Sequence, residues 1–311
     1  MGWQALRYGT PYRGSKNAIA EWVVEHLPSA PVLVDLFAGG CAVTHAAMLS
    51  GRFKRFVAND LTEAPQVFAD AVNGEFDGFA TVPTREEFLS SDDDALRLMY
   101  SFGNNREDYL WSRDLEPVKV SASRMVLGAS VHERKRAYKD FMRALRSYLE
   151  SAGRMPGCDR QHDGSLEGLQ GLERLEGLER LQGLERLQGL DGPLTVSRSD
   201  YRAVGVPVGA TVYADPPYRG TDCRGYHDVG RFDFEAFDTW LSVVPFMVVV
   251  SEYTAPDGCV EVARKDKRVN MDAQGKASNR IERLFVQERF ADEYRERMDG
   301  ETLFDECSPR S

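Results

Sequence analysis

The chain has 311 residues, five cysteines and a formal net charge of −10 at neutral pH. The cysteines are widely spaced and form no Cys-x-x-Cys pair, which argues against a disulfide framework or a zinc site and favours a reducing compartment. No run approaches the roughly 18 apolar residues of a membrane helix, and the N-terminus lacks a secretory signal pattern. We therefore expect a cytoplasmic protein whose charge disfavours general coating of nucleic acid but permits one local basic face.

The first part of the chain alternates helix and strand patterns. Apolar residues recur at helical spacing over residues 15–27, and a buried-strand pattern follows over 31–37. After a glycine turn, residues 41–49 read as a helix, residues 55–60 as a second strand, and the stretch to about residue 73 as another helix. The order strand, glycine turn, helix, strand predicts a doubly wound α/β sheet with ligands at the carboxyl ends of its strands.

Residues 76–150 change character and carry polar helical patterns. The clearest helix, 133–149, has one apolar stripe: Tyr138, Phe141, Met142, Leu145, Tyr148 and Leu149. Its polar surface carries six cations: Arg134, Lys135, Arg136, Lys139, Arg143 and Arg146. A solvated face and a DNA-contacting face are both compatible with this charge run.

Residues 166–190 place a leucine at every third position. Because an α-helix advances about 100° per residue, a period of three gives no fixed helical stripe. Five glycines within the segment weaken a helix further. The segment reads as a low-complexity expansion or, alternatively, as short turns that stack their leucines.

The α/β pattern resumes downstream. Strand patterns cover 211–215, 246–253 and 281–288, and a helix pattern covers 234–241. The core is therefore predicted to be split, with the middle region inserted between its halves. The acidic end of the chain, from about residue 291, lacks a sustained apolar pattern, and we expect it to fray.

The stretch "TVYADPPY", residues 211–218, ends a buried strand in an unusual way. Pro216 and Pro217 cannot donate ladder hydrogen bonds, so they stop the strand directly after Asp215. The expected loop tip offers the Asp215 carboxylate, the Pro216 carbonyl and an exposed aromatic ring at Tyr218. Such a group can hold a planar amino-heterocycle by its edge and its face.

A second constellation, "VDLFAGGC", joins a strand to a helix through Gly39 and Gly40. Glycines there allow a ligand to approach the backbone and the free N–H groups of the helix. Asp60 ends the next strand, where a carboxylate can bind both hydroxyls of a ribose or, alternatively, cap the following helix. Together these features predict a nucleoside site.

The motifs together resemble those of a known family. "YGTPYRGSK", "DLFAGG", "AND", "YADPPY" and "VVVSEY", in this order, are similar to the motifs of S-adenosylmethionine-dependent DNA adenine methylases of the Dam type. The resemblance covers roughly residues 1–75 and 193–287, and the family's target-recognition region falls where the insertion is predicted. It implies a Rossmann-like doubly wound methyltransferase core with an inserted, mainly helical target-recognition region.

The resemblance also implies a domain division. Residues 1–75 would be the cofactor-binding first part of the core, and residues 76–192, including the repeat, the inserted recognition region. Residues 193–290 would be the second part of the core, followed by an acidic tail at 291–311. One departure concerns the glycine motif, usually Phe-x-Gly-x-Gly, because Cys41 stands at the place of the last glycine.

Site roles in the core are carried over by the same resemblance, whereas the six cations of the 133–149 helix are assigned to DNA from their charge run. The catalytic motif is Asp215, Pro216, Pro217 and Tyr218. The cofactor-binding set is Tyr8, Lys16, Asp35, Phe37, Gly39, Gly40, Asp60 and Asp215. Ser251 and Tyr253 would support the base pocket. The DNA-binding set is Arg134, Lys135, Arg136, Lys139, Arg143 and Arg146, with Lys276 and Arg280 of "KASNRIERLF" on phosphates.

The implied reaction is methyl transfer from S-adenosylmethionine to the exocyclic amino nitrogen of a flipped-out adenine in double-stranded DNA. No metal is expected, because a sulfonium is already a good leaving group. A monomer or weak dimer in a bacterial or phage-infected cell is expected, with a cognate restriction endonuclease as a candidate partner. An RNA adenine methyltransferase and a catalytically inactive DNA-binding relative are the alternatives.

Overall fold

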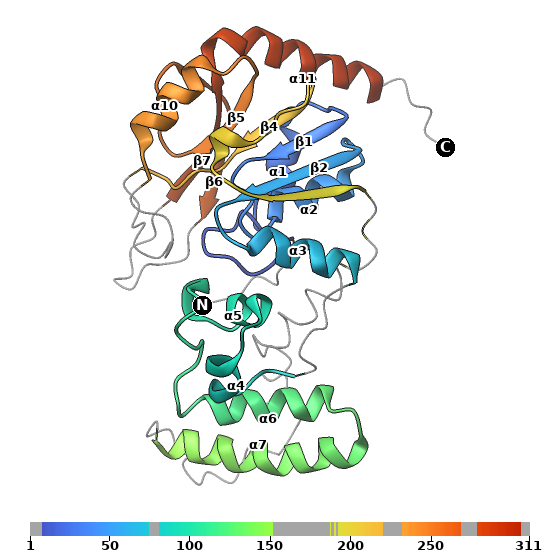
Figure 1. The fold of residues 1–311 in the computed structure, drawn as a ribbon, viewed down its shortest axis with the longest axis vertical. Coiled ribbons are helices and arrows are strands. Elements are labelled where there is room, and N and C mark those ends of the chain that lie inside the picture. Colours follow the sequence, from blue (N-terminus) through green and yellow to red (C-terminus); the bar gives the residue numbers. More distant parts are fainter. Residues whose placement is uncertain are drawn as a thin grey trace. The chain divides into compact units, whose positions relative to one another are not determined.

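The computed structural model describes residues 8–74, 81–151, 187, 190, 192–219, 232–268 and 279–305 (Figure 1). The chain divides into two compact units. One unit contains residues 1–9, 14–69 and 189–311, and the other contains residues 10–13 and 70–188. Within the described residues, no helix combines the length and the apolar character needed to cross a bilayer.

A seven-stranded sheet forms the centre of the first unit (Figure 1). In spatial order its strands are β3 (Leu194–Arg198), β2 (Arg55–Asp60), β1 (Val32–Asp35), β4 (Thr211–Ala214), β5 (Val248–Glu252), β7 (Asn279–Gln287) and β6 (Cys259–Arg268). Strands β1 to β5 are parallel, and β7 runs antiparallel to both of its neighbours. The predicted doubly wound α/β fold is confirmed.

The order of the sheet reverses between β1 and β4. From β1 the chain continues to β2 on one side, whereas β4 lies on the other side of β1 and leads to β5. Such a switch point separates the loops that leave the two strands and opens a crevice at their carboxyl ends. The loops that follow Asp35 and Ala214 therefore flank one ligand-binding position.

Five α-helices complete this part of the chain: α1 (Ala20–Glu25), α2 (Ala42–Ser50), α3 (Ala64–Asn73), α10 (Phe234–Val243) and α11 (Ala291–Asp305). Two short 3₁₀ turns, Tyr201–Ala203 and Glu288–Phe290, follow β3 and β7. The helix predicted over 15–27 is shorter than expected, because its first residues form turns.

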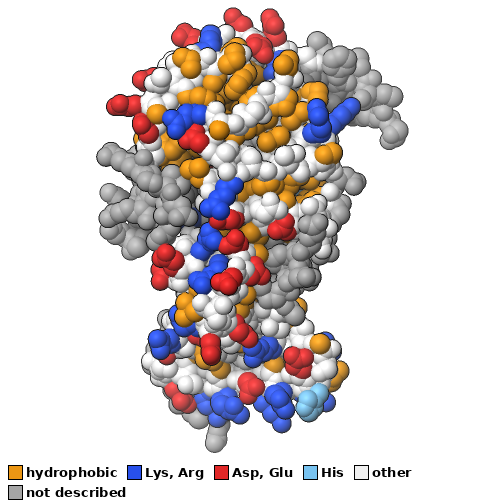
Figure 2. Space-filling view, in the orientation of Figure 1, with side chains coloured by type: hydrophobic (Ala, Val, Ile, Leu, Met, Phe, Trp, Pro, Cys, Tyr) orange, Lys and Arg blue, Asp and Glu red, His pale blue; other side chains and the backbone are white. Residues whose placement is uncertain are grey.

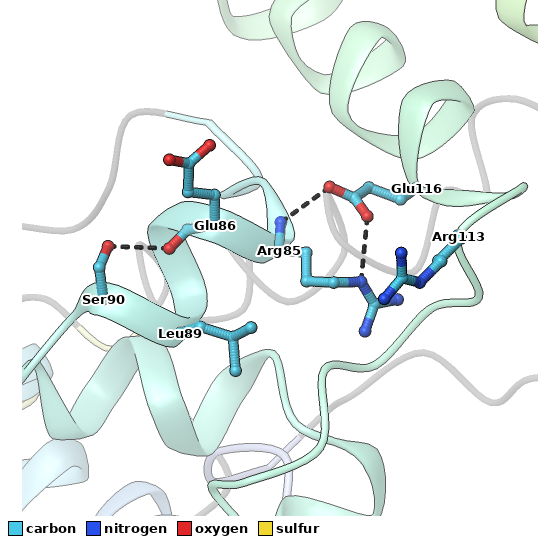
Figure 3. Close-up of a pocket in the computed structure, with 6 residues that line it drawn as sticks. All are labelled: Arg85, Glu86, Leu89, Ser90, Arg113 and Glu116. Carbon is cyan, nitrogen blue, oxygen red and sulfur yellow. Dashed lines mark hydrogen bonds and ion pairs between the residues drawn. The ribbon is translucent and has the colours of Figure 1, made fainter.

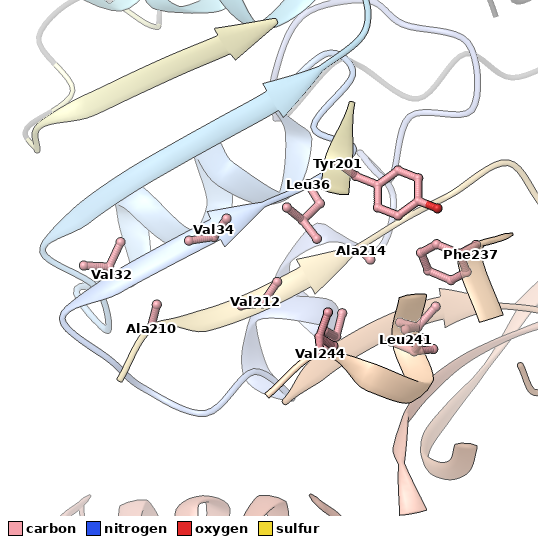
Figure 4. Close-up of a cluster of buried hydrophobic side chains, with 12 residues drawn as sticks. Val32, Val34, Leu36, Tyr201, Ala210, Val212, Ala214, Phe237, Leu241 and Val244 are labelled. Carbon is pink, nitrogen blue, oxygen red and sulfur yellow. The ribbon is translucent and has the colours of Figure 1, made fainter. Parts of the chain in front are cut away.

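Residue alternation along the strands decides which face each helix covers. One buried cluster joins even-numbered strand residues to α10 (Figure 4), and its members include Val32, Val34, Leu36, Val212, Ala214, Phe237 and Leu241. Leu33 and Asp35 point to the opposite face, where the hydroxyl of Thr44 on α2 donates a 2.9 Å hydrogen bond to Asp35. Strands β1, β4 and β5 are buried on both faces. Their sequences are therefore nearly continuous runs of apolar, mostly β-branched residues, as is typical of parallel strands.

The second unit is helical in its described part. Its elements are α4 (Arg85–Ser90), α5 (Asp94–Met99), the 3₁₀ turn Phe102–Asn104, α6 (Glu116–Leu127) and α7 (Val131–Ser151). Helices α6 and α7 pack through Val118, Ala122 and Phe141. The amphipathic helix predicted from the sequence is thus present, but Tyr138 and Met142 of its proposed stripe are exposed. Ala137 and Ala144 take the places facing α6.

Two strands and the end of the chain differ from the sequence prediction. Strands β3 and β6 were not predicted, because both are polar strands at the edges of the sheet. The segment expected to fray from residue 291 forms α11 instead. Tyr294 anchors this helix, since its ring is buried and its hydroxyl donates a 2.9 Å hydrogen bond to the carbonyl of His26. The leucine repeat 166–190 lies outside the described residues, apart from Leu187 and Leu190.

Candidate active site

The loops after β1 and β4 bring the two main sequence motifs together. Asp35 pairs with Tyr213 in the parallel register, so the glycine turn and the Asp215-Pro-Pro segment leave the sheet side by side. Strand β4 ends at Ala214, as Pro216 and Pro217 predicted. The central strand is completely buried, which fixes the direction in which Asp215 leaves it.

Asp215 forms an ion pair with Lys16. The ammonium nitrogen lies 2.7 Å from Oδ1 of Asp215, and the side chains are 8% and 16% exposed. Burial raises the pKa of the Asp215 carboxyl, against the effect of the Lys16 ammonium. Burial alone would lower the pKa of Lys16, but Asp215 and Glu282 raise it above its usual value. The lysine therefore stays cationic and favours the ionised carboxylate beside it.

Tyr218 is buried rather than exposed, so the expectation of a free aromatic plate is wrong. Its hydroxyl donates a 2.9 Å hydrogen bond to Glu282 and lies 2.8 Å from the hydroxyl of Ser251. The Lys16 ammonium lies 4.5 Å from the centre of its ring, and Tyr253 meets the ring edge to face at 4.4 Å. These contacts hold the ring between the ends of β4, β5 and β7.

Burial raises the pKa of Tyr218 well above its ordinary value, so the phenol remains protonated. Its proton is directed to Glu282, and Ser251 must then act as the donor in the other short contact. Ser251 itself is fully buried on β5. The predicted pocket-support residues Ser251 and Tyr253 thus both contact Tyr218.

The turn after β1 contains two left-handed residues. Gly39 has φ 47° and Cys41 has φ 59°, and both lie just before α2. Glycine adopts this conformation freely, whereas a residue with a Cβ pays a steric penalty. The backbone at position 41 therefore has the geometry expected for the family's glycine, although a buried cysteine occupies it.

Asp60 holds this turn in place. Its Oδ2 accepts a 2.9 Å hydrogen bond from the N–H of Gly39, and its Oδ1 accepts from the N–H and the hydroxyl of Thr62. Burial raises the pKa of Asp60 despite these bonds. The carboxylate thus holds the glycine turn and the residue two positions ahead, before α3 begins at Ala64. Ribose binding stays a prediction.

Asp35 has an unsatisfied buried oxygen. Its Oδ2 accepts from Thr44, whereas Oδ1 is buried and meets no hydrogen bond of ordinary geometry from the residues that the structure describes. Burial raises its pKa to about 7. A buried orphan acceptor costs free energy unless a ligand supplies a donor. Together with the glycine turn, this oxygen fits a cofactor that carries an amino group and a nucleoside, as S-adenosylmethionine does.

The segment before α1 is fastened to the glycine turn. The N–H of Gly9 donates a 3.0 Å hydrogen bond to Nδ1 of His45 on α2, and burial lowers the pKa of His45 to about 4, which keeps this nitrogen an acceptor. A Cβ on Gly9 would lie 2.1 Å from the carbonyl oxygen of Gly40. Only glycine permits this approach, and Tyr8 beside it is buried with its hydroxyl bonded to Glu21.

The remaining predicted core residues occupy less central places. Phe37 packs in an aromatic group with Tyr201 and Phe237, at ring distances of 5.2 and 6.0 Å. It supports the loop between β1 and α2 and lies partly in the hydrophobic core. Lys276 and the side chain of Arg280 fall outside the described residues.

Two acidic residues of the site were missed by sequence reasoning. Glu282 on β7 and Glu252 on β5 are 1% and 2% exposed. Glu252 accepts a 3.0 Å hydrogen bond from the N–H of Arg219, directly after the Pro-Pro-Tyr segment. The signal available was a glutamate inside each strand pattern, at a position where an apolar residue is normal.

The six predicted DNA-binding cations of α7 are all exposed. At about 100° per residue, five of them lie on the arc opposite Ala137 and Phe141: Lys135, Arg136, Lys139, Arg143 and Arg146. Arg134 instead lies against the turn between α6 and α7, near Gly128. Figure 2 shows the blue side chains gathered along the edge of the unit that α7 forms.

The same unit has an open hollow of about 620 Å³ beside α4 (Figure 3). The guanidinium of Arg85 is tied to Glu116, with Nε 3.3 Å from a carboxylate oxygen, and also bonds the carbonyl of Trp111. Arg113 projects into the hollow from the opposite wall (Figure 3). These contacts make Arg85 a structural residue of the helical unit.

A parallel sheet with this strand order, an antiparallel seventh strand and an acidic motif at its switch point defines a Rossmann-like methyltransferase core. Residues 12–154 match the family model of the D12 class N6 adenine-specific DNA methyltransferases. This match confirms the resemblance to the Dam-type family and supports methyltransferase activity, for which S-adenosylmethionine is the implied methyl donor.

Other comparisons add little. A Pyrococcus horikoshii protein of known structure, provisionally described as an RNA methyltransferase, is 10% identical, with 91% of this chain and 90% of that chain covered and a TM-score of 0.33. No curated protein matches the sequence.

Proposed function

We propose that the protein is a site-specific DNA adenine methyltransferase that transfers a methyl group to the exocyclic amino nitrogen of adenine. The observation that carries this proposal is the Lys16–Asp215 ion pair at the end of the buried strand β4, beside the glycine turn of β1. A carboxylate paired with an ammonium group there, followed by Pro-Pro-Tyr, is suited to accept hydrogen bonds from an amino group.

In this proposal Lys16 binds Oδ1 of Asp215, and the carboxylate is the first acceptor for the amino group of the target base. The Pro216 carbonyl is the second acceptor. Two acceptors orient the amino nitrogen and restrict its rotation, so positioning supplies much of the rate enhancement. When bound, S-adenosylmethionine supplies an electrophilic methyl group with a neutral thioether as leaving group.

The cofactor would be held by residues around the β1 loop. Asp35 offers its orphan oxygen to an amino group, and Gly39 and Gly40 allow close approach of the backbone. Asp60 would bind the ribose hydroxyls, while Tyr8 fixes the segment that leads to Lys16. Stacking of the target base on Tyr218 would require the Lys16 ammonium to leave the ring face.

We assign target recognition to the helical unit because its longest helix presents a positive surface in an acidic protein. Along the outward arc of α7, five cations occur before the first acidic residue, Glu150. Cations on one exposed helix face are suited to phosphate contacts, which set affinity rather than sequence preference.

Substitution of Asp215 tests this function. Purified wild-type protein and the Asp215→Asn variant are incubated with methyl-labelled S-adenosylmethionine and either unmethylated genomic DNA or RNA, followed by nucleoside analysis. We expect N6-methyladenine in DNA from the wild type and a loss of at least about 100-fold in the variant, because an amide supplies only one acceptor oxygen and also donates.

The exposed Asp257→Asn variant is the matched control and should retain activity. Methyladenine only in RNA would contradict the DNA assignment. Cofactor binding without transfer to either nucleic acid would identify an inactive relative.

A further inference from the structure

Glu282 is a charged residue in an unusual position. It lies within the antiparallel strand β7, is 1% exposed, and is surrounded by the buried end of the sheet. Further along the same strand, Leu284 and Phe285 are apolar and equally buried. Because burial of a carboxylate is costly unless it is paired, the fold must gain something from this side chain.

Glu282 contacts the proposed catalytic loop directly. Its Oε2 accepts the 2.9 Å hydrogen bond from the phenol of Tyr218, and Ser251 completes the group at 2.8 Å from the same hydroxyl. One ring is thereby fixed from two neighbouring strands, β5 and β7. Since Tyr218 follows Asp215 by three residues, this anchor also limits how far the loop can shift.

Glu282 also acts on the ion pair. Its charge raises the pKa of Lys16 and raises the pKa of Asp215. The other charged or titratable groups that act on this pair come from four elements or loops: Asp35 at the end of β1, Tyr213 on β4, Tyr218 in the following loop, and Glu252 with Tyr253 at the end of β5. The negative charges of Asp215 and Glu282 thus both favour the charged form of Lys16.

We propose that Glu282 is a positioning residue for methyl transfer, which anchors the Tyr218 hydroxyl and acts through its charge on the Lys16–Asp215 ion pair. It acts through these residues and does not touch the reacting atoms. The inference rests on the proposed function, because it assigns Glu282 a part in the same reaction.

The Glu282→Gln variant tests both roles. The amide oxygen can still accept from Tyr218, but the negative charge is lost. Removing this charge lowers the pKa of Asp215 and also that of Lys16. Both limbs of the pH profile of kcat/KM should therefore move to lower pH, by about one unit each. A purely structural role would change activity without moving both limbs in the same direction.

The Glu282→Asp variant separates the anchor from the charge. The shorter side chain keeps its charge but cannot reach the phenol, so kcat should fall about tenfold while the limbs stay in place. The KM for S-adenosylmethionine should change little. Glu288→Gln, on an exposed glutamate just after β7, is the control and should match the wild type.

The outcomes are distinct from those for the proposed function. If the wild type methylates DNA and both Glu282 variants reproduce its pH profile and kcat, the inference is overturned. If the wild type transfers no methyl group, the proposed function fails, and carboxyl-carbon NMR titration of Asp215 still tests the inference: its pKa must fall in Glu282→Gln. Should that variant not fold, the kcat of Glu282→Asp decides, and a wild-type value refutes the anchor.

Discussion

Cys41 shows how a single residue can depart from a family pattern while its backbone does not. The glycine motif requires a left-handed residue before α2, and position 41 has φ 59°. A non-glycine residue pays roughly 1–2 kcal/mol there. The buried thiol partly offsets this cost by filling the space next to the turn.

The balance between backbone strain and side-chain packing at position 41 predicts that the smaller of two substitutions gives the more stable protein. Cys41→Ala keeps the strained backbone and loses the packing of the sulfur, whereas Cys41→Gly loses the sulfur but relieves the strain. We expect the glycine variant to be more stable than the alanine variant by about 1 kcal/mol. Urea unfolding of both variants measures the difference. A more stable alanine variant would show that Cys41 is not strained.

Single residues also mark the limit of sequence reasoning. Asp215 and Lys16 were predicted from their motifs, and the structure brings them into contact although they lie about 200 residues apart. Glu282 could not be identified in this way. It reaches the site only because β7, the last strand in the chain, lies between β5 and β6 in the sheet. No local sequence pattern specifies this strand order.

At the scale of elements, buried strands were predictable and edge strands were not. Strands β1, β4 and β5 have apolar, largely β-branched sequences typical of a covered sheet, and the predicted positions of these strands and of β2 agree with the structure. Strand β6 is polar and pairs on one side only, so its sequence resembles a loop. Helix α11 was missed because just a few of its residues pack against the core.

Helix α7 provides a test at this scale. Its outward cations are predicted to contact phosphates, so replacing Lys135, Lys139 and Arg143 with Gln should weaken DNA binding. The slope of log affinity against log salt should shrink by up to about 0.9 per lost contact. Fluorescence anisotropy at several salt concentrations measures this slope.

The matched control neutralises three exposed arginines of the sheet unit, Arg202, Arg264 and Arg295. An equal loss of slope in both triple variants would mean that α7 has no special role. An unchanged slope in the α7 variant alone would leave its cations as a solvated face.

At the scale of the whole molecule, the proposed site draws on sequence from both sides of the helical unit. Lys16, Asp35 and Asp60 precede this unit in the chain, whereas Asp215 and Glu282 follow it. The two parts meet through continuous strand pairing, β1 with β4 and β2 with β3. The sheet therefore joins the two halves without a covalent link at the site itself.

Because the residues of the site come from both sides of the helical unit, the chain can be divided into two fragments that each lack part of the site. A break after Ser151 would give fragments 1–151 and 152–311, neither of which contains both members of the Lys16–Asp215 pair. Co-expressed fragments should reassemble along the two strand pairs and restore methylation, while each fragment alone should be inactive. Methylation by one fragment alone would refute the site assignment. If both expectations hold, methylation of DNA would take place only where the two fragments are present together.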